Sequence, residues 1–439
     1  MSNLKTYKFS DLYEMSSGIS SKPEQAGHGT PFLSFSAVFK NHFLPEDLLD
    51  LMNIREEEMK TYSIKEGDIF LTRTSETLDD LGMSSVTVKT YPKASFSGFL
   101  KRLRPIQTDV TYHKFMAFYL RSKLFRKTMT NNAIMTLRAS LNEQIFSYLQ
   151  LILPTYSEQK KIGDFLYQIN QKIELNNRIN TELEAMAKLI YAYWFVQFDF
   201  PFDFAQGKPA DDTSKPQDIK PYKSSGGKMV WNKALKREIP EGWEDGTLLD
   251  IATFNNGIAC QKYRPKEAEE RYSVIKIREM NNGFSESTEF VKTEIPKTAI
   301  ISNGDVLFSW SATLEVKIWS EGIGALNQHI FKVTSKNFPR TYYYFELLIY
   351  LEHFKMMANL RKTTMGHITQ DHLKQSRIAI PNRTLIQSLH NKINPILDKI
   401  VKNKEENRQL STLLDWLLPM LMNGQVRVME ENPNYEKKM

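Results

Sequence analysis

The sequence contains two copies of one pattern, and this internal repeat constrains the fold more than any other feature. The segment SDLYEMSSGIS at 10–20 returns as LDIATFNNGIA at 249–259, with a Gly-Ile pair at the same place in each. The segment IKEGDIFLTRTS at 64–75 returns as ISNGDVLFSWSA at 301–312, and both are typical of a Gly-Asp turn that leads into a β-strand. The chain is therefore expected to form two related domains that contain β-sheet.

A long heptad pattern follows each copy. Pro154 and Pro381 precede the two patterns, 227 residues apart, and every seam position is shifted by the same number. Because proline ends the segment before each helix, Ser157 and Thr384 are the expected N-caps. Steps of four and three residues, typical of a coiled-coil seam, connect Ile162, Leu166, Ile169, Ile173, Asn176, Asn180, Leu183, Ala187, Ile190 and Trp194 in the first helix, and Leu389, Ile393, Ile396, Ile400, Asn403, Asn407, Leu410, Leu414, Leu417 and Leu421 in the second.

Two asparagines interrupt each seam, Asn176 and Asn180 in the first helix and Asn403 and Asn407 in the second. If the helices pack together, the four amides can meet in one central layer in either orientation. Such a layer fixes the helix register, because a slipped pairing leaves buried amides unpaired. The alternative is a hydrated polar break in a half-exposed helix. Seams of about 33 residues span roughly 50 Å, so we expect the helices to act as spacers.

Composition indicates a folded protein without a membrane span or an internal disulfide. Of the 439 residues, 41% are hydrophobic and 25% charged, which is ordinary for a globular chain. The N-terminus lacks the apolar run of a signal peptide, and the most apolar stretch, LIYAYWFVQF, is too short to span a bilayer. The only cysteine, Cys260, cannot form an internal disulfide, which favours a reducing compartment such as the cytoplasm.

The distribution of charge indicates a nucleic-acid partner more clearly than the net charge of +7 does. Between 112 and 138 there is no Asp or Glu, and such a basic stretch can hold phosphates through Lys114, Arg121, Lys123, Arg126, Lys127 and Arg138. In the matching stretch of the second copy, Arg361 and Lys362 accompany two glutamates, Glu346 and Glu352. A solvated helix face is the alternative interpretation there.

Polar residues follow or precede the repeated strands in both copies. Arg73, Thr74, Ser75 and Glu76 follow the first Gly-Asp strand, whereas Asn327, Gln328 and His329 precede a later strand of the second copy. Arg, Asn and Gln side chains read guanine and adenine edges, so these residues are candidates for base contacts. The alternative is that they only tie loops together.

Enzyme motifs are absent or weak. No GxGxxG sequence follows a strand, and SSGGKMV lacks the spacing of a phosphate-binding loop. Asp305 with Glu315 and Lys317 matches the spacing of many Mg²⁺ nucleases, but no Glu-x-Lys follows the equivalent Asp68. The histidines lack metal-ligand spacing. We therefore expect no catalytic residue and no metal site.

The chain resembles the specificity subunit of type I restriction-modification systems over nearly its whole length. The resemblance rests on the two-copy plan and on LPTYSEQKKIGDFLYQINQKIELN, PYKSSGGKMVWNKALKREIPEGW and MGHITQDHLKQSRIAIP. Pro154, Glu158, Gln159 and Ile162 match the family's helix-start motif. The second copy departs from this motif, with Ile386 where Glu158 is expected to align.

The resemblance implies an α+β fold in which two repeated α/β target-recognition domains are separated by two long antiparallel coiled-coil-like helices. The expected segments are recognition domain 1 at 1–154, spacer helix 1 at 155–198, a linker at 199–240, recognition domain 2 at 241–383, spacer helix 2 at 384–424 and a tail at 425–439. Each recognition domain would read one half of a bipartite DNA site, so helix length would set the spacing of the half-sites.

The resemblance also implies partners. A specificity subunit is not catalytic, binds double-stranded DNA, docks two methyltransferase subunits on its helices and is joined by a restriction subunit. It carries no cofactor, and S-adenosylmethionine, ATP and Mg²⁺ are expected on the partner subunits. Two alternatives stay open at this point: a self-contained DNA-modifying enzyme, and a coiled-coil adaptor without a DNA role.

Overall fold

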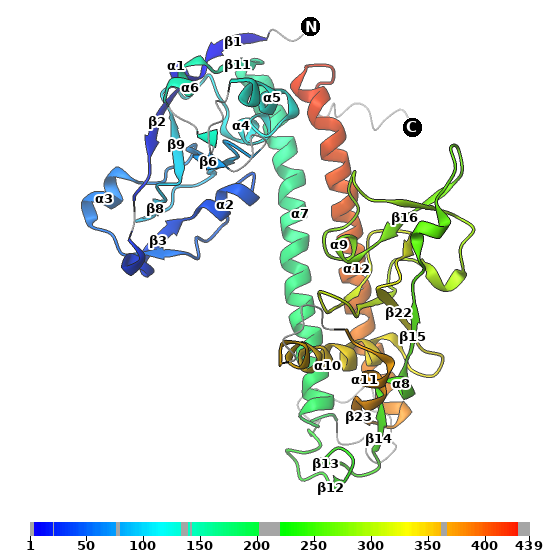
Figure 1. The fold of residues 1–439 in the computed structure, drawn as a ribbon. Helices are drawn as coiled ribbons and strands as arrows, with labels where there is room; N and C mark the ends of the chain where they lie inside the picture. Colours follow the sequence, from blue (N-terminus) through cyan, green and yellow to red (C-terminus); the bar gives the residue numbers. More distant parts are fainter. Residues whose placement is uncertain are drawn as a thin grey trace, which may run out of the picture. The chain divides into compact units, whose positions relative to one another are not determined.

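A computed structural model describes residues 4–20, 22–75, 80–132, 139–140, 143–201, 220–360 and 367–428. The chain forms two compact units (Figure 1). Unit 1 comprises Met1–Ile173 and Leu410–Met439, and unit 2 comprises Glu174–Gln409. No helix among the described residues is long and apolar enough to cross a membrane.

Unit 1 is built on a four-stranded antiparallel sheet in the order β2-β9-β5-β7. A second sheet has the order β4-β3-β8, in which β3 and β8 run parallel. The strands are β1 (Lys5–Lys8), β2 (Tyr13–Ser17), β3 (Ala26–Leu33), β4 (Leu51–Met52), β5 (Ile69–Thr72), β6 (Thr74–Ser75), β7 (Ser84–Val86), β8 (Ser95–Phe96), β9 (Leu100–Pro105), β10 (Ala139–Ser140) and β11 (Gln150–Leu153). The short helices are α1 (Phe9–Leu12), α2 (Phe35–Lys40), α3 (Glu56–Thr61), α4 (His113–Tyr119), α5 (Lys123–Asn132) and α6 (Glu143–Tyr148).

Unit 2 repeats this topology. Its antiparallel sheet has the order β15-β22-β19-β20, and its second sheet, β17-β16-β21-β18, again contains one parallel pair, β16 with β21. The strands are β12 (Met229–Asn232), β13 (Arg237–Pro240), β14 (Glu244–Thr247), β15 (Thr253–Asn256), β16 (Arg271–Ile275), β17 (Phe290–Lys292), β18 (Ile300–Ile301), β19 (Val306–Ser309), β20 (Glu315–Ile318), β21 (Gly324–Leu326), β22 (Ile330–Thr334) and β23 (Arg377–Ile380). The short helices are α8 (Leu248–Ile251), α9 (Ile277–Asn282) and α11 (Gln370–Gln375), and α10 (Arg340–Leu360) is longer.

The matching strand orders confirm the repeat that the sequence predicts. In each unit, a strand before the first sheet pairs antiparallel with the strand that precedes the long helix, β1 with β11 in unit 1 and β14 with β23 in unit 2. Each copy of the repeat is therefore closed before its long helix begins. The fold combines repeated sheet-rich units with long helices and is α+β, as expected.

The long helices are α7 (Tyr156–Tyr191), continued by one π-helical turn at Ala192–Val196, and α12 (Arg383–Met422). The expected N-caps are wrong by two residues. Thr155 Oγ1 accepts from Glu158 N at 3.4 Å, and Asn382 Oδ1 accepts from Leu385 N at 2.8 Å. Both caps directly follow the prolines, and their side chains reach the amides of the third helical residue. The helix α12 continues through both of its prolines, Pro395 and Pro419.

The start of α7 is tied to unit 1 by Gln159. Its Oε1 accepts from Tyr112 N at 2.9 Å, and its Nε2 donates to the carbonyls of Val110 at 2.9 Å and Pro154 at 3.0 Å. The expected match of Ile386 to Glu158 is wrong. Under the shift of 227, the buried Ile386 stands at the position of Gln159, so apolar packing replaces this amide anchor in the second copy.

The four seam asparagines meet within unit 2. Asn403 Nδ2 donates to Asn180 Oδ1 at 2.9 Å, and Asn176 Nδ2 donates to Asn407 Oδ1 at 2.8 Å. The pairing numbers run in opposite directions, so the helices are antiparallel in this unit. Asn176, Asn180 and Asn403 are buried, and this rules out a hydrated break. A one-turn slip would separate each buried amide from its partner, which is the physical basis of a fixed register.

The ends of the long helices complete the two hydrophobic cores. Leu421 and Met422, at the end of α12, pack into the core of unit 1. Trp194 and Phe195, 227 residues earlier, pack into the core of unit 2. Each unit is therefore closed by the helix that follows the other copy in the sequence.

Part of the expected linker is folded. Within 199–240, residues 229–240 form the antiparallel hairpin β12–β13, and Tyr222 stacks on Phe200 with ring centroids 4.7 Å apart. Residues 202–219 lie outside the described part. The polar composition of 220–240 concealed this structure because only two of the twelve hairpin residues, Ile239 and Pro240, are buried.

Unit 2 contains a buried acid beside the end of α7. The Tyr191 hydroxyl donates to Glu346 Oε1 at 2.7 Å, and burial raises the pKa of Glu346 from 4.5 to about 7. Between these pH values the folded carboxyl keeps a proton that the unfolded chain has released. The stability of unit 2 should therefore fall as pH rises from 4.5 to 7 and then level off.

We expect Glu346→Gln to remove this pH dependence, because the amide fills the same space without ionising. In the wild-type chain, the pKa shift corresponds to a fall of roughly 3 kcal/mol in the free energy of unfolding as pH rises through this range. Denaturant unfolding of both chains at pH 5 and pH 8 measures the effect, with hydrogen exchange of α10 reporting on unit 2. Equal pH slopes in the two chains would contradict this account.

Candidate functional site

A tight turn between β8 and β9 forms a rigid edge of unit 1. Ile19 N donates to Phe96 O at 2.9 Å, Gly98 N to Ile19 O at 2.7 Å, and Leu100 N to Ser97 O at 2.9 Å. A Cβ atom on Gly18 would lie closer than 3.0 Å to the carbonyl oxygens of both Phe96 and Ser97. The Gly-Ile pair that repeats in the sequence thus packs directly against this turn and hydrogen-bonds to it.

The same turn recurs in unit 2 between β21 and β22. Ile258 N donates to Leu326 O at 2.8 Å, Gln328 N to Ile258 O at 3.0 Å, and Ile330 N to Asn327 O at 3.1 Å. A Cβ atom on Gly257 would meet the carbonyl oxygens of Leu326 and Asn327. We call the two structures, Ser97–Leu100 and Asn327–Ile330 with their flanking strand ends, the turn edges.

Arg73 lies on the turn edge of unit 1. Its backbone N donates to Phe99 O at 2.9 Å, and its Nη1 donates to Gly98 O at 3.4 Å. The following residues, Thr74 and Ser75, form β6, which pairs antiparallel with β10. Two segments distant in sequence, Thr74–Ser75 and Ala139–Ser140, are therefore neighbours. Glu76 and Arg138 themselves lie outside the described residues.

The turn edge of unit 2 carries Trp310, an aromatic residue that was not among the expected candidates. Trp310 occupies the repeat position of Arg73, and its N donates to His329 O at 3.4 Å. Its Nε1 donates to Asn256 Oδ1 at 3.1 Å, and its ring centroid is 5.7 Å from those of both His329 and His367. Aligning the two copies of the repeat places Trp310 at the position of Arg73, and this alignment could have identified Trp310 as a candidate from the sequence.

The three polar candidates of this edge differ in role. Asn327 is buried, its Nδ2 donates to Cys260 Sγ at 3.8 Å, and its Oδ1 accepts from His329 N at 3.4 Å. We therefore assign Asn327 to holding the turn. Gln328 is partly exposed and His329 is exposed, so these two side chains can reach a ligand.

The basic stretch does not form one continuous surface. The Arg121 guanidinium donates to the carbonyls of Ser84, Val38, Phe39 and Asn41, at 2.6 to 3.0 Å, and burial lowers its pKa to about 10. Arg121 thus ties the junction of α4 and α5 to α2 and to β7. Its interpretation as a phosphate contact is wrong, because these donors point inward.

The other basic residues of the stretch are either held by neighbouring side chains or exposed to solvent. Lys114 Nζ pairs with Asp164 Oδ1 at 2.9 Å and lies over the Tyr167 ring. Arg126 is half-buried, whereas Lys123 and Lys127 are exposed on α5. Arg361 and Lys362 lie outside the described residues. Lys123 and Lys127 remain the candidates for phosphate contacts.

The carboxylates with nuclease-like spacing are kept apart by the sheet. Asp305 precedes β19 and pairs with Lys332 at 2.8 Å, while Glu315 pairs in register with Ser309 at the opposite end of that strand. One metal ion cannot bind both, since four strand residues separate them by roughly 13 Å. Among the described residues, no group of three His, Cys, Asp or Glu side chains is placed to hold a metal.

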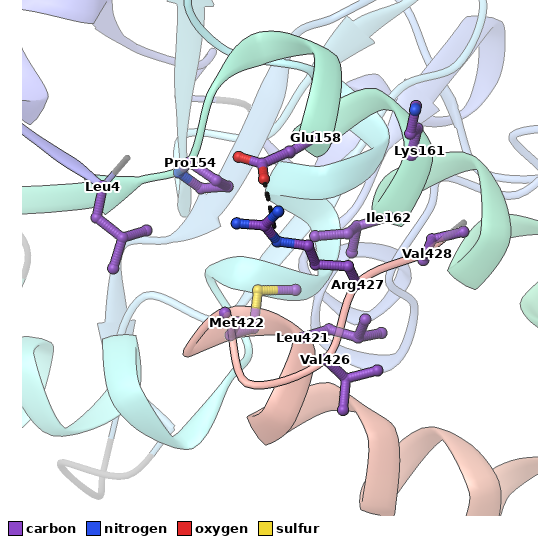
Figure 2. A pocket seen from close by; sticks show the side chains of 11 residues that line it. Leu4, Pro154, Glu158, Lys161, Ile162, Leu421, Met422, Val426, Arg427 and Val428 are labelled. Carbon is purple, nitrogen blue, oxygen red and sulfur yellow. Dashed lines mark ion pairs between the residues drawn. The ribbon is translucent and has the colours of Figure 1, made fainter. Parts of the chain in front are cut away.

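The helix-start motif lines a small cavity in unit 1. Figure 2 shows Pro154, Glu158 and Ile162 around this cavity of about 160 Å³, together with the end of α12. The dashed line marks the ion pair of Arg427 Nε with Glu158 Oε1, 3.8 Å apart. Apolar side chains, among them Leu421 and Met422, make up much of the lining. We interpret the motif as the place where the start of α7 packs against the end of α12.

The repeated turn edges coincide with a repeated family match. The family model for the type I restriction modification DNA specificity domain matches residues 1–185 and 240–412. The chain belongs to this family. Each match includes one turn edge and most of the long helix that follows it, so the type I specificity domain is present in two copies.

Curated relatives carry names that agree with this assignment. The type I restriction enzyme MjaIX specificity subunit of Methanocaldococcus jannaschii is 21% identical, covering 86% of this chain and 82% of the relative. The HindI specificity subunit of Haemophilus influenzae is 23% identical, covering 97% of this chain and all of the relative. A crystal structure of the type I S subunit from M. genitalium has a TM-score of 0.60 at 12% identity, covering 98% of this chain and 97% of that one, and shows a shared fold.

Proposed function

We propose that this chain is the DNA specificity subunit of a type I restriction-modification complex and that each unit reads one half of a bipartite, gapped site. The supporting observation is the turn edge, built twice with the same backbone bonds but with different side chains. Arg73 and Phe99 occupy it in unit 1, and Trp310 and His329 occupy the same positions in unit 2. One scaffold with two different surfaces suits two different half-sequences.

The chemistry of the exposed side chains fits DNA. Lys123 and Lys127 can contact phosphates, which position a protein on the duplex without reading sequence. Arg73, Gln328 and His329 can donate hydrogen bonds to base edges. We propose that α5 contacts phosphates and that the turn edges contact bases.

The long helix offers a surface for a protein partner. Six large apolar side chains of α7 and its π-turn are exposed in unit 2, at steps of four, seven, three, four and three residues that place them on one side of the helix: Leu175, Ile179, Met186, Leu189, Tyr193 and Val196. We propose that methyltransferase subunits dock on such helix surfaces, two copies per chain, and that a restriction subunit joins them. S-adenosylmethionine, ATP and Mg²⁺ would be bound by those partners, in the cytoplasm.

Single-molecule sequencing of DNA from a methylation-free host tests this function. The host expresses this chain with and without its neighbouring methyltransferase gene. Adenine methylation at a two-part gapped motif only when both are present supports the proposal. Methylation by this chain alone indicates a self-contained enzyme. If neither condition gives methylation and the purified chain-methyltransferase complex lacks salt-dependent DNA binding, the adaptor alternative is favoured.

A further inference from the structure

We propose that the side chain at the third position of each turn edge, Phe99 in unit 1 and His329 in unit 2, determines specificity for its own half-site. Phe99 would make an apolar contact with base edges, and His329 would make a hydrogen bond to them. This inference rests on the proposed function and names the residues through which it operates.

Phe99 is exposed on an immobilised backbone. Its side chain is 65% exposed, although phenylalanine is ordinarily buried. Its N donates to Ser97 Oγ at 3.2 Å, and its O accepts from Arg73 N at 2.9 Å. The ring is therefore presented to solvent by a turn that has little conformational freedom left to lose on binding.

The second copy supports the same position independently. The residue before His329 makes the same hydrogen bond as the residue before Phe99, from Gln328 N to Ile258 O at 3.0 Å. The backbone O of His329 accepts from Trp310 N, just as the backbone O of Phe99 accepts from Arg73 N. Its ring is exposed and lies 5.7 Å from the Trp310 ring. Two sequences that differ at this position both place an exposed ring there, so the shared feature belongs to the scaffold.

The chemical difference between the rings predicts different base preferences. A phenyl ring has no hydrogen-bonding group, and in a DNA groove it makes apolar contact with a thymine methyl group. The Arg73 guanidinium beside it can contact the neighbouring guanine or phosphate. Histidine offers ring nitrogens instead, and Gln328 adds an amide beside them. We therefore expect a thymine within the half-site read by unit 1.

Phe99→Ala tests the inference in the assembled methyltransferase complex. Affinity is measured for duplexes with the correct site, with the first half-site changed and with the second changed. We expect about tenfold weaker binding to the correct site and about tenfold less discrimination at the first half-site, with discrimination at the second unchanged. A duplex with deoxyuridine in place of the contacted thymine should weaken the wild-type complex and not weaken the variant further.

Ile106→Ala is the matched control. Ile106 is 58% exposed and follows the same strand, β9, at the end opposite Phe99. It should bind like the wild type, and both variants should keep the wild-type Tm within about 2 °C because the changed side chains are exposed. His329→Ala should reduce discrimination at the second half-site only. His353→Ala, at an exposed position on α10, is its control and should bind like the wild type.

The outcomes separate the inference from the proposed function. A wild-type complex that discriminates at neither half-site overturns the proposed function. A discriminating wild type with a Phe99→Ala variant that behaves like Ile106→Ala overturns only the role of the turn-edge ring. Equal loss of discrimination at both half-sites also overturns it, since a unit-specific contact cannot act on the other half.

Discussion

Replacing Gly18 with alanine should abolish methylation of the DNA site by the assembled complex. The added Cβ would lie closer than 3.0 Å to two backbone oxygens of the turn edge and to the Phe96 ring. Backbone atoms cannot rotate away as a flexible side chain can, so the turn must shift. We expect a loss of about 3 kcal/mol in the stability of unit 1 and a more than 100-fold loss of methylation.

Gly27→Ala provides the control for this experiment. Gly27 has a φ of +85°, but no heavy atom lies within 4 Å of the position that an added Cβ would take. Its replacement should therefore cost only about 1 kcal/mol of backbone strain and leave methylation intact. Methylation assays and thermal unfolding of the three chains make the comparison. Wild-type activity and Tm in the Gly18→Ala chain would show that the turn edge is not fixed as described.

Replacing Leu421 and Met422 together with alanine should destabilise unit 1 selectively. Both side chains are at most 3% exposed and lie in the core of unit 1, although they end α12, the last helix among the described residues. Removing a buried Leu or Met side chain costs about 2 to 5 kcal/mol, so we expect about 4 kcal/mol or more for the pair. Hydrogen exchange should accelerate in α4 and β9 and stay unchanged in β22.

Trp416→Ala is the control on the same helix. The Trp416 side chain is 63% exposed, so its removal should leave hydrogen exchange in both units unchanged. If the double variant behaved like Trp416→Ala, the end of α12 would not be part of the unit 1 core. Equal acceleration in both units would likewise contradict the assignment of Leu421 and Met422 to one unit.

The long-range features of the fold were predictable because they are duplicated. A constant shift of 227 residues identified the two helices, and the asparagines kept in that register predicted the amide layer between them. Local details were less predictable. Ser157 and Thr384 were the expected caps, but Thr155 and Asn382 stand nearer the prolines and take that role.

Side-chain direction explains most of the errors in the candidate site. Arg121 and Lys123 are two residues apart in one basic stretch, yet Arg121 points inward to four carbonyl groups while Lys123 is exposed. A run of basic residues gives their number and not their direction. Trp310 was missed for a related reason, because an aromatic residue after a buried strand is ordinarily core. Only the alignment of the two copies places it at the turn edge, at the position that Arg73 takes in unit 1.

The most direct test of the central claim, that each unit reads its own half-site, is an exchange of residues 241–383 for the corresponding segment of a relative with a different recognition sequence. The exchanged chain is expressed with the methyltransferase in a methylation-free host, and the methylated motif is read by single-molecule sequencing. We predict that one half of the motif changes while the other half is retained. A motif changed in both halves, or retained in both, would contradict it.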